Sequence, residues 1–255
     1  MRDNSAAAIE DATRRMAFSR RLRAWYRTNG RDLPWRRTRD PYRILVSELM
    51  LQQTQVSRVL GYYDRFLERF PDLAHLARAR PRQVREAWEG LGYYARARNL
   101  HRLAREVTDR GASPNERLPS DPQRLRELPG IGEYTAGAVA SFAYEQRAAL
   151  VDTNVARVLR RAFAPDADTR NASGRRRIWE IARKLLPRTG RATWTHNQAL
   201  MELGALVCTA RVARCDACPV HAECLTARQR PGASRKGADP GARKRPRMPR
   251  MIQHE

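Results

Sequence analysis

The segment "LPGIGEYTAGAV", residues 128 to 139, decides the fold class, because it joins two apolar stretches through a tight turn. Gly130 and Gly132 flank Ile131, and a run of small residues follows. Glycine permits a left-handed backbone and lets another group approach the chain closely. Outward-pointing N–H groups at the start of the next helix would form an anion site suited to a DNA phosphate. An ordinary helix–turn–helix connection explains the same residues, so both interpretations stay open for the turn alone.

Apolar residues on both sides of this turn follow a helical period. Phe18, Leu22 and Tyr26 share one face of a helix that we expect to end at Gly30. Asp40 is expected to cap a helix whose apolar spacing continues to about Pro71. Further helices are predicted near residues 135–142, 153–163, 175–186 and 195–207. No alternating strand pattern of useful length appears, so the sequence predicts an all-α fold.

Charge is the most unusual property of the composition. The 255 residues carry a formal net charge of +23 at pH 7, and the sequence pI is near 11.3. Such a balance favours a polyanionic partner, and nucleic acid is the commonest one. No apolar run reaches the ~18 residues of a membrane span, and the first residues lack the apolar core of a signal peptide. We therefore expect no membrane partner and a cytoplasmic location.

The two ends of the chain differ from the centre. Residues 226–255 are rich in proline, glycine and basic residues without periodicity, and cannot bury enough apolar surface to fold alone. We expect this segment to be a disordered basic tail that attracts phosphates without sequence preference. Residues 1–15 are expected to be flexible as well.

Four cysteines stand close together near the C-terminal end. Cys208, Cys215, Cys218 and Cys224 follow the pattern C-x6-C-x2-C-x5-C. Cytosolic thiols stay reduced, so metal ligation is favoured over disulfides. Four thiolates suit a structural zinc ion as well as a [4Fe–4S] cluster, and the array alone does not distinguish them.

Two carboxylates stand in unusual local contexts. Glu48 lies in the apolar stretch "SELMLQQ", where burial would raise its pKa and let it hold a proton at neutral pH. Asp152 in "VDTNV" precedes a predicted helix, and its simplest interpretation is an N-cap. Near a sugar, the same carboxylate would stabilise developing positive charge.

Several of these segments together resemble a known family. "LPGIGEYTAGAV" followed by "VDTNV" resembles the helix-hairpin-helix, endonuclease III-like DNA glycosylases. "SELMLQQTQVSRVLGYYDRF", "WEGLGYYARARNLH" and the cysteine array are similar to the MutY-type adenine DNA glycosylases of that superfamily. The resemblance covers about residues 18–225.

The family resemblance implies a two-lobed helical core over residues 16–225, with DNA in the groove between the lobes. One lobe would span about 36–145 and contain the hairpin 126–140. The other would combine 16–35 with 146–225 and hold one [4Fe–4S] cluster on the four cysteines.

The same resemblance implies roles in catalysis. Glu48 would protonate the adenine at N7 and help activate water, while Asp152 would stabilise the oxocarbenium-like sugar. Asn154 would bond near that aspartate. Tyr134 stands where strand-cutting relatives carry a lysine, and a phenol cannot form a Schiff base. The implied enzyme removes a base without cutting the strand.

Further positions match the family's substrate and DNA contacts. Core packing is an equally good interpretation of Trp35 and Tyr93, and Gln198 has the alternative of an ordinary polar helix residue. The resemblance implies an adenine pocket of Arg31, Trp35, Arg36 and Gln198. It also implies a wedge of Leu51, Gln52, Gln53 and Thr54, with Gln53 near the base opposite adenine. Further DNA contacts are implied at Gly90, Gly92, Tyr93, Gly130 and Gly132.

Two departures from the family pattern affect the prediction. Ala156 stands where typical members carry a lysine. Typical members also have a C-terminal domain that recognises 8-oxoguanine, and we expect this chain to offer only the basic segment in its place. We predict a monomeric, bacterial, monofunctional glycosylase that acts on mispaired duplex DNA in base excision repair. It would excise adenine opposite 8-oxoguanine or guanine. A thymine or uracil mismatch glycosylase, a bifunctional lyase and a non-catalytic DNA-binding protein remain alternatives.

Overall fold

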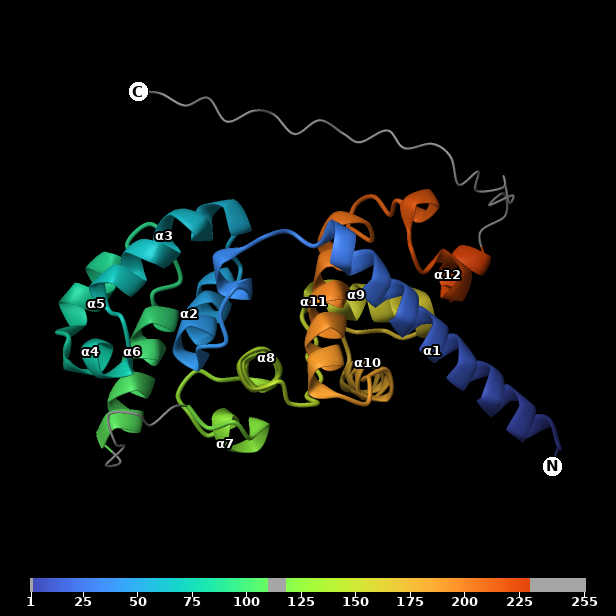
Figure 1. Cartoon of the computed structure of the whole chain (residues 1–255), viewed down its shortest axis with the longest axis horizontal. Coiled ribbons are helices and arrows are strands. Elements are labelled where there is room, and N and C mark those ends of the chain that lie inside the picture. The colour runs from blue at the N-terminus through green and yellow to red at the C-terminus, as the bar shows by residue number, and fades with distance from the viewer. Residues whose placement is uncertain (1, 110–117, 230–255) are drawn as a thin grey trace, which may run out of the picture.

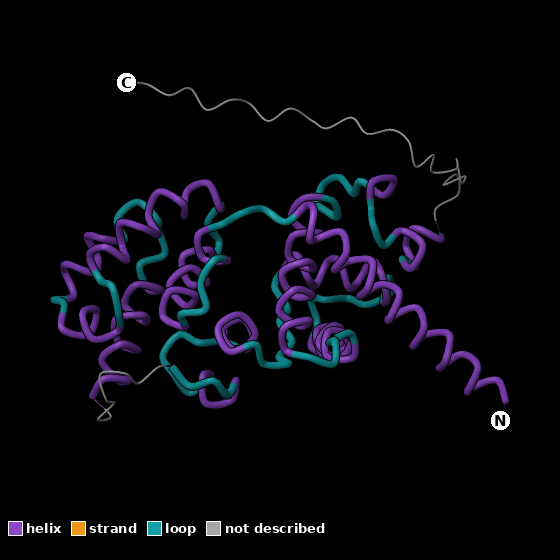
Figure 2. The backbone as a smooth tube through the Cα atoms, in the orientation of Figure 1, coloured by secondary structure: helices purple, strands orange, loops and turns teal. Residues whose placement is uncertain are grey.

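The computed structural model of the protein describes residues 2–109 and 118–229, and within these ranges it contains no β-strand (Figures 1 and 2). A single isolated bridge joins Cys208 to Ala213. The predicted all-α fold is confirmed. The helices are α1 (Arg2–Asn29), α2 (Pro41–Leu51), α3 (Val56–Arg69), α4 (Leu73–Arg78), α5 (Pro81–Ala87), α6 (Ala95–Asp109), α7 (Pro122–Arg126), α8 (Glu133–Tyr144), α9 (Thr153–Phe163), α10 (Ala172–Lys184), α11 (Gly190–Leu206) and α12 (Leu225–Arg228), with short 3-10 turns η1 (Pro34–Arg36), η2 (Cys215–Ala217) and η3 (His221–Glu223).

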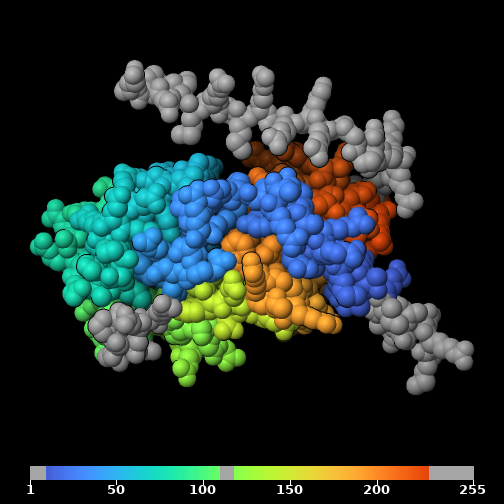
Figure 3. Space-filling model, viewed as in Figure 1, coloured from blue at the N-terminus to red at the C-terminus, as the bar shows by residue number. Residues whose placement is uncertain are grey.

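The helices form two groups that α8 and α7 connect along one side (Figure 1). Helices α2 to α6 form one lobe, and α9 to α12 form the other together with α1. Helix α1 packs against α11, where Ser19 Oγ and His196 Nδ1 lie 3.0 Å apart in a buried contact. The space-filling view shows the blue N-terminal part of the chain lying directly against the orange α11 region (Figure 3). The second lobe is therefore built from both ends of the described chain.

Helix α2 is the most deeply buried element of the first lobe. Its start is fixed by Asp40, whose Oδ1 accepts a hydrogen bond of 2.8 Å from the N–H of Arg43, and by Pro41 in the first turn. The predicted cap is thus confirmed. The predicted continuous helix up to Pro71 is wrong, because α2 ends at Leu51 and α3 begins at Val56. Gln53 between them is left-handed, with φ of 56°, and a helix cannot pass through that conformation.

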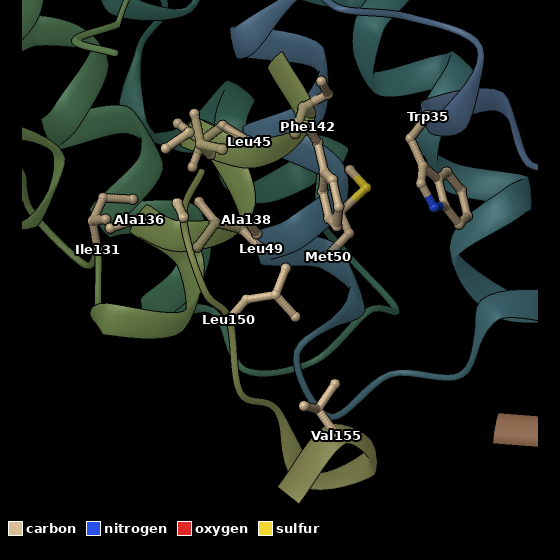
Figure 4. Packing of buried hydrophobic residues seen from close by; sticks show 14 of the residues in the cluster. Trp35, Leu45, Leu49, Met50, Ile131, Ala136, Ala138, Phe142, Leu150 and Val155 are labelled. Carbon is tan, nitrogen blue, oxygen red and sulfur yellow. The ribbon is translucent and has the colours of Figure 1, made fainter. Parts of the chain in front are cut away.

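Helix α8 explains the small residues of the opening segment. Ala136, Ala138 and Phe142 are buried against α2, whose Leu49 and Met50 meet them in the core (Figure 4). The helix also approaches the backbone that follows it, since a Cβ added at Gly137 would stand 2.1 Å from the carbonyl oxygen of Ala149. The small side chains are therefore required for close packing on both sides of α8.

The two turn glycines differ in their need for conformational freedom. Gly130 has φ of 78°, and a Cβ there would stand 2.7 Å from the side chain of Asn99. Gly132 caps α8 with φ of −87°, which every residue tolerates, and a Cβ there would meet nothing within 4 Å. Of the two turn glycines, only Gly130 therefore has a backbone conformation that favours glycine. A side chain at position 132 would meet no neighbouring atom within 4 Å.

The N-terminal segment differs from its prediction. Helix α1 begins at Arg2 rather than near residue 16, and Arg14 lies over the ring of Phe163 at 5.0 Å. Residues 10–15 thus belong to this helix, and Arg14 contacts the second lobe. Of the predicted basic tail, residues 230–255 lie outside the described residues. No helix in the described ranges is long and apolar enough to cross a membrane.

Candidate active site

A cavity of about 1620 Å³ lies where α2, α8, α9 and α11 converge. Its walls come from both lobes and from the hairpin, which explains why the contributing residues are far apart in sequence. It brings together all the predicted catalytic and substrate-contacting residues and four of the predicted DNA contacts: Arg31, Trp35, Arg36, Glu48, Leu51, Gln52, Gln53, Thr54, Gly130, Gly132, Tyr134, Asp152, Asn154 and Gln198.

Glu48 is a buried carboxyl group on α2 whose neighbours along the helix are mostly apolar. The Tyr134 hydroxyl donates a hydrogen bond of 2.7 Å to its Oε2. Burial raises the pKa of Glu48 to about 7. The hydrogen bond from Tyr134 and the positive charge of Arg36 oppose this rise, whereas the negative charge of Asp152 adds to it. The expected rise in pKa is confirmed, and Glu48 can hold or release a proton near neutral pH.

Asp152 is the N-cap of helix α9 and also lies on the cavity wall. Its Oδ1 caps α9 by accepting a hydrogen bond of 2.6 Å from the N–H of Val155, and its Oδ2 accepts one of 3.1 Å from Asn154 Nδ2. Burial raises the pKa of Asp152, while these hydrogen bonds to the charged form oppose the rise. The capping carboxylate also lines the cavity, so one group serves the helix and faces the site.

Asn154 extends this polar chain along the cavity wall to Arg157. Arg157 Nη2 donates to Asn154 Oδ1 at 2.7 Å, and its Nε donates to the carbonyl of Cys208 at 2.8 Å. Close packing of α9 on α11 accompanies these bonds, since a Cβ at Gly204 would stand 2.7 Å from Asn154 Cβ. Asp152 is therefore joined through two side chains to the beginning of the cysteine loop.

Tyr134 lies next to Glu48, to which its hydroxyl donates a hydrogen bond. Burial raises its pKa well above the usual value, and the charges of Glu48 and Asp152 raise it further. The phenol thus stays protonated and acts as a hydrogen-bond donor. No lysine is found among the described residues that line the cavity, and Ala156 occupies the wall at the position where the family pattern has an amine.

A second buried carboxylate, Glu202 on α11, is a site residue that the sequence analysis missed. Its side chain is completely buried and accepts hydrogen bonds from both nitrogens of the Arg31 fork, at 2.7 and 3.0 Å, and from Arg36 Nη2 at 2.8 Å. Burial would raise its pKa, but the arginine hydrogen bonds outweigh burial and lower the value to about 2. The sequence signal was available, because "ALMELGAL" places a glutamate in an apolar stretch just as "SELML" does.

Arg31 and Arg36 therefore have an electrostatic partner inside the protein. Arg36 also lies over the ring of Tyr26 at 5.6 Å and donates to the carbonyl of Arg31 at 2.9 Å. Its charge acts on Glu48, as the pKa of Glu48 shows. The two arginines and Glu202 thus form a fixed polar wall of the cavity.

The remaining predicted pocket residues have mixed surroundings. Trp35 is 6% exposed and packs edge-on against Tyr63 with ring centroids 5.4 Å apart, so it belongs to the core as well as to the cavity wall (Figure 4). Gln198 is buried on α11, one turn before Glu202. The side chain of Gln52 donates to Thr135 Oγ1 at 3.4 Å, which ties the 51–54 turn to α8.

The turn at residues 90–93 lies outside the cavity. Gly90 and Gly92 have φ of 90° and 73°, and the next residue, Tyr93, has φ of 50° and is 56% exposed. A Cβ at Gly90 would stand 2.2 Å from the Tyr62 hydroxyl. The exposed ring of Tyr93 favours a surface contact over the alternative of core packing.

The four cysteines are half-buried in the loop after α11, and none forms a disulfide. Burial raises the pKa of Cys218 to about 12, and the other three thiols contribute to the rise, so all four interact electrostatically. In the described part of the chain, no three His, Cys, Asp or Glu side chains are spaced to hold one metal ion. Zinc would need every sulfur about 2.3 Å from a single ion, whereas a [4Fe–4S] cluster binds each thiolate at a different iron atom. The all-thiolate donor set is compatible with the cluster that the family resemblance implies.

Comparison with known proteins places this geometry in a family. Residues 46–186 match the family model described as HhH-GPD superfamily base excision DNA repair protein. The adenine DNA glycosylase of Rattus norvegicus is 43% identical over 242 residues, covering 92% of this chain and 45% of that protein. The one of Mycobacterium tuberculosis is 46% identical over 200 residues, covering 78% and 64%. The chain thus spans less than half of the rat relative and under two thirds of the mycobacterial one.

Solved structures share the fold. A thermostable thymine-DNA glycosylase superposes with a TM-score of 0.76 at 30% identity, covering 85% of this chain and 97% of that one. A trapped covalent intermediate of endonuclease III with DNA superposes with a TM-score of 0.67 at 23% identity, covering 82% and 93%. The helical architecture, the matched residues and these relatives agree, and the chain belongs to the HhH-GPD superfamily of base excision DNA repair proteins.

Proposed function

We propose that this protein is a monofunctional DNA glycosylase that removes adenine mispaired with 8-oxoguanine or guanine in duplex DNA. The observation that carries the proposal is the pair of carboxyl groups in one cavity, with Glu48 at a pKa of about 7 and Asp152 held by hydrogen bonds to its charged form. Relatives named adenine DNA glycosylase, at 43% and 46% identity, supply the choice of base.

The two carboxyl groups divide the chemistry between them. The adenine must leave the helix stack to reach the cavity. Protonated Glu48 transfers its proton to N7 of the adenine, and the bond from N9 to the sugar carbon breaks with its electrons leaving on the base. Ionised Asp152 stabilises the cationic sugar that remains. Water then adds to the sugar carbon and gives a proton to the Glu48 carboxylate, which restores the acid.

The cavity walls support recognition of the base. Gln198 offers both a donor and an acceptor, the combination that the edge of adenine requires. Arg31 and Arg36 are held in place by Glu202 and present a fixed cationic wall. With a phenol at Tyr134 and no lysine among the described lining residues, the geometry supports hydrolysis by water over Schiff-base chemistry.

The cysteine loop would hold one [4Fe–4S] cluster on Cys208, Cys215, Cys218 and Cys224. Bound there, the cluster would supply a covalent cross-link of a loop that has little regular structure of its own. We further propose that the protein works as a monomer on chromosomal DNA in a bacterial cytoplasm.

A panel of duplexes tests the function. Adenine opposite 8-oxoguanine, guanine and cytosine is compared with G·T and G·U under single-turnover conditions, with and without alkali. We expect adenine release opposite 8-oxoguanine and guanine, with strand breaks appearing only after alkali. Asp152→Asn is the matched control, because asparagine still caps α9 but lacks the charge. Thymine release with untouched adenine would instead favour the activity named for the thymine-DNA glycosylase neighbour.

A further inference from the structure

Arg96 is a buried arginine that no catalytic step uses. It lies in the first turn of α6, is 7% exposed, and makes no ion pair with a carboxylate in the described residues. Its two amino groups are instead surrounded by six oxygen acceptors. A buried charge is stable only when such bonds replace its hydration.

The first group of acceptors belongs to the end of α2 and the turn after it. Arg96 Nη1 donates to the carbonyls of Leu49 and Met50, both at 2.8 Å, and to the carbonyl of Gln52. Arg96 Nη2 donates to Thr54 Oγ1 at 3.2 Å. A cation at a helix C-terminus satisfies carbonyls that have no partner within the helix. Arg96 thereby fixes the path of residues 51–54.

The second group belongs to the turn at residues 90–93. Arg96 Nη2 donates to the carbonyls of Leu91 and Gly92 at 3.2 and 3.1 Å. The guanidinium also lies 5.2 Å from the ring centre of Tyr93. The Arg96 side chain therefore bonds to two turns that are far apart in sequence: Gln52 lies 44 residues before Arg96, and Gly92 lies 4 residues before it.

Both turns contain a strained residue. The described residues include three non-glycine positions with positive φ, and two of these are Gln53 at 56° and Tyr93 at 50°. Left-handed backbone at such residues persists only where the surroundings enforce it, and it is concentrated at functional sites. Gln53 lines the cavity, and Tyr93 is an exposed residue of the turn whose carbonyls bond to Arg96.

We infer that Arg96 is a positioning residue that locks the 51–54 turn and the 90–93 turn into one rigid unit, which enters the DNA stack when adenine is extruded. The inference rests on the proposed function. Arginine suits this task because its planar fork donates in several directions at once, whereas a lysine donates from a single point. Unstacking a base consumes free energy, and a preformed wedge provides its contacts without first ordering two loops.

The experiment measures base extrusion separately from cleavage. The full chain carries Asp152→Asn so that no base is lost, and the DNA carries fluorescent 2-aminopurine at the adenine position opposite 8-oxoguanine. Protein with native Arg96 is expected to raise the fluorescence at saturation, because the base unstacks. Arg96→Gln and Arg96→Lys should lose most of this rise while still binding the duplex. In protein that keeps the native Asp152, Arg96→Gln and Arg96→Lys should each slow single-turnover excision about 100-fold, as misplacement of a positioning group does.

Arg98→Gln is the matched control, since it removes the same charge from an exposed position of the same helix. It should keep the full fluorescence rise. Circular dichroism checks the folding of each variant, and Arg96→Lys carries the test where Arg96→Gln does not fold. A full rise in the Arg96 variants would overturn the inference and leave the proposed function standing. No rise with native Arg96 would also overturn the inference, while the excision panel decides separately whether the proposed function stands.

Discussion

The Tyr134 hydroxyl and the Glu48 carboxyl form a hydrogen-bonded pair of 2.7 Å that joins the hairpin helix to the acid of the first lobe. This bond lowers the pKa of Glu48, while burial raises it to about 7. The protonation of the acid therefore depends on a residue whose own proton stays in place at all physiological pH values.

Tyr134→Phe should raise the pKa of Glu48, because the donor that stabilises its carboxylate is gone. Activity that needs protonated Glu48 falls as pH rises through this pKa, so the alkaline limb of the excision profile should move to higher pH. The free energy of unfolding should fall by about 1 kcal/mol for one lost hydrogen bond. Tyr63→Phe, which loses a hydroxyl bonded to the carbonyl of Arg43, is the control. An alkaline limb that stays in place would contradict the assignment of the acid.

Glu202→Gln should move the alkaline limb of the excision pH profile to lower pH. With the Glu202 charge removed, the positive charge of Arg36 acts on Glu48 uncompensated and lowers its pKa. Removal of one partner from a buried ion pair also destabilises a fold by about 3–5 kcal/mol. Asp32→Asn breaks the exposed ion pair with Arg37 in the same segment and should change neither property. Equal pH profiles for Glu202→Gln and the native protein would refute this coupling.

Glu48→Gln should increase stability at alkaline pH while abolishing excision. The folded-state pKa of about 7 lies above the ordinary value of 4.5, so native stability falls as pH rises between these values. Glutamine does not ionise and avoids this loss, which is on the order of 3 kcal/mol at most. Urea unfolding at pH 8 and at pH 4 measures the effect. The gain should vanish at pH 4, and a gain of equal size at both values would show that ionisation is not its cause.

Purified protein should be yellow-brown and contain four iron and four sulfide per chain, as a [4Fe–4S] cluster requires. Metal analysis and the visible absorption spectrum measure this directly. Cys218→Ser should reduce the iron content and lower the melting temperature, because the loop loses a cross-link. An active, colourless preparation with one zinc per chain would show that the four thiolates bind a structural zinc ion instead of the cluster.

The sequence predicted those features that have a local pattern. Asp40, Asp152 and the apolar periods define most helix starts, and Glu48 could be found because a carboxylate in an apolar stretch is rare. The break at Gln53 could not be found, because "LQQTQV" continues the helical spacing and the residue bonded to this turn, Arg96, is distant in sequence. Arg96 itself left no signal, since its acceptors are mainly backbone carbonyls, which every residue has.

Charge pairs between distant segments were equally hidden. Arg31 and Arg36 could be assigned to the pocket only through family resemblance, and their real partner, Glu202, lies 171 residues after Arg31. The length of α1 was also underestimated, because the polar residues 10–15 give no strong period, yet Arg14 finds a ring on α9. Such contacts become visible only when the two ends of the chain are brought together.

The packing of α1 on α11 has a consequence for biosynthesis. The first helix leaves the ribosome long before its partner, and domains are made in order from the N-terminus. The residues of α1 that pack on α11, and the neighbouring Arg31, therefore lack these partners until α11 has been translated, whereas the lobe of α2 to α6 has been synthesised by then. Helix α11 therefore completes both the second lobe and the polar wall beside Glu48, so the cavity cannot assemble before α11 has been translated.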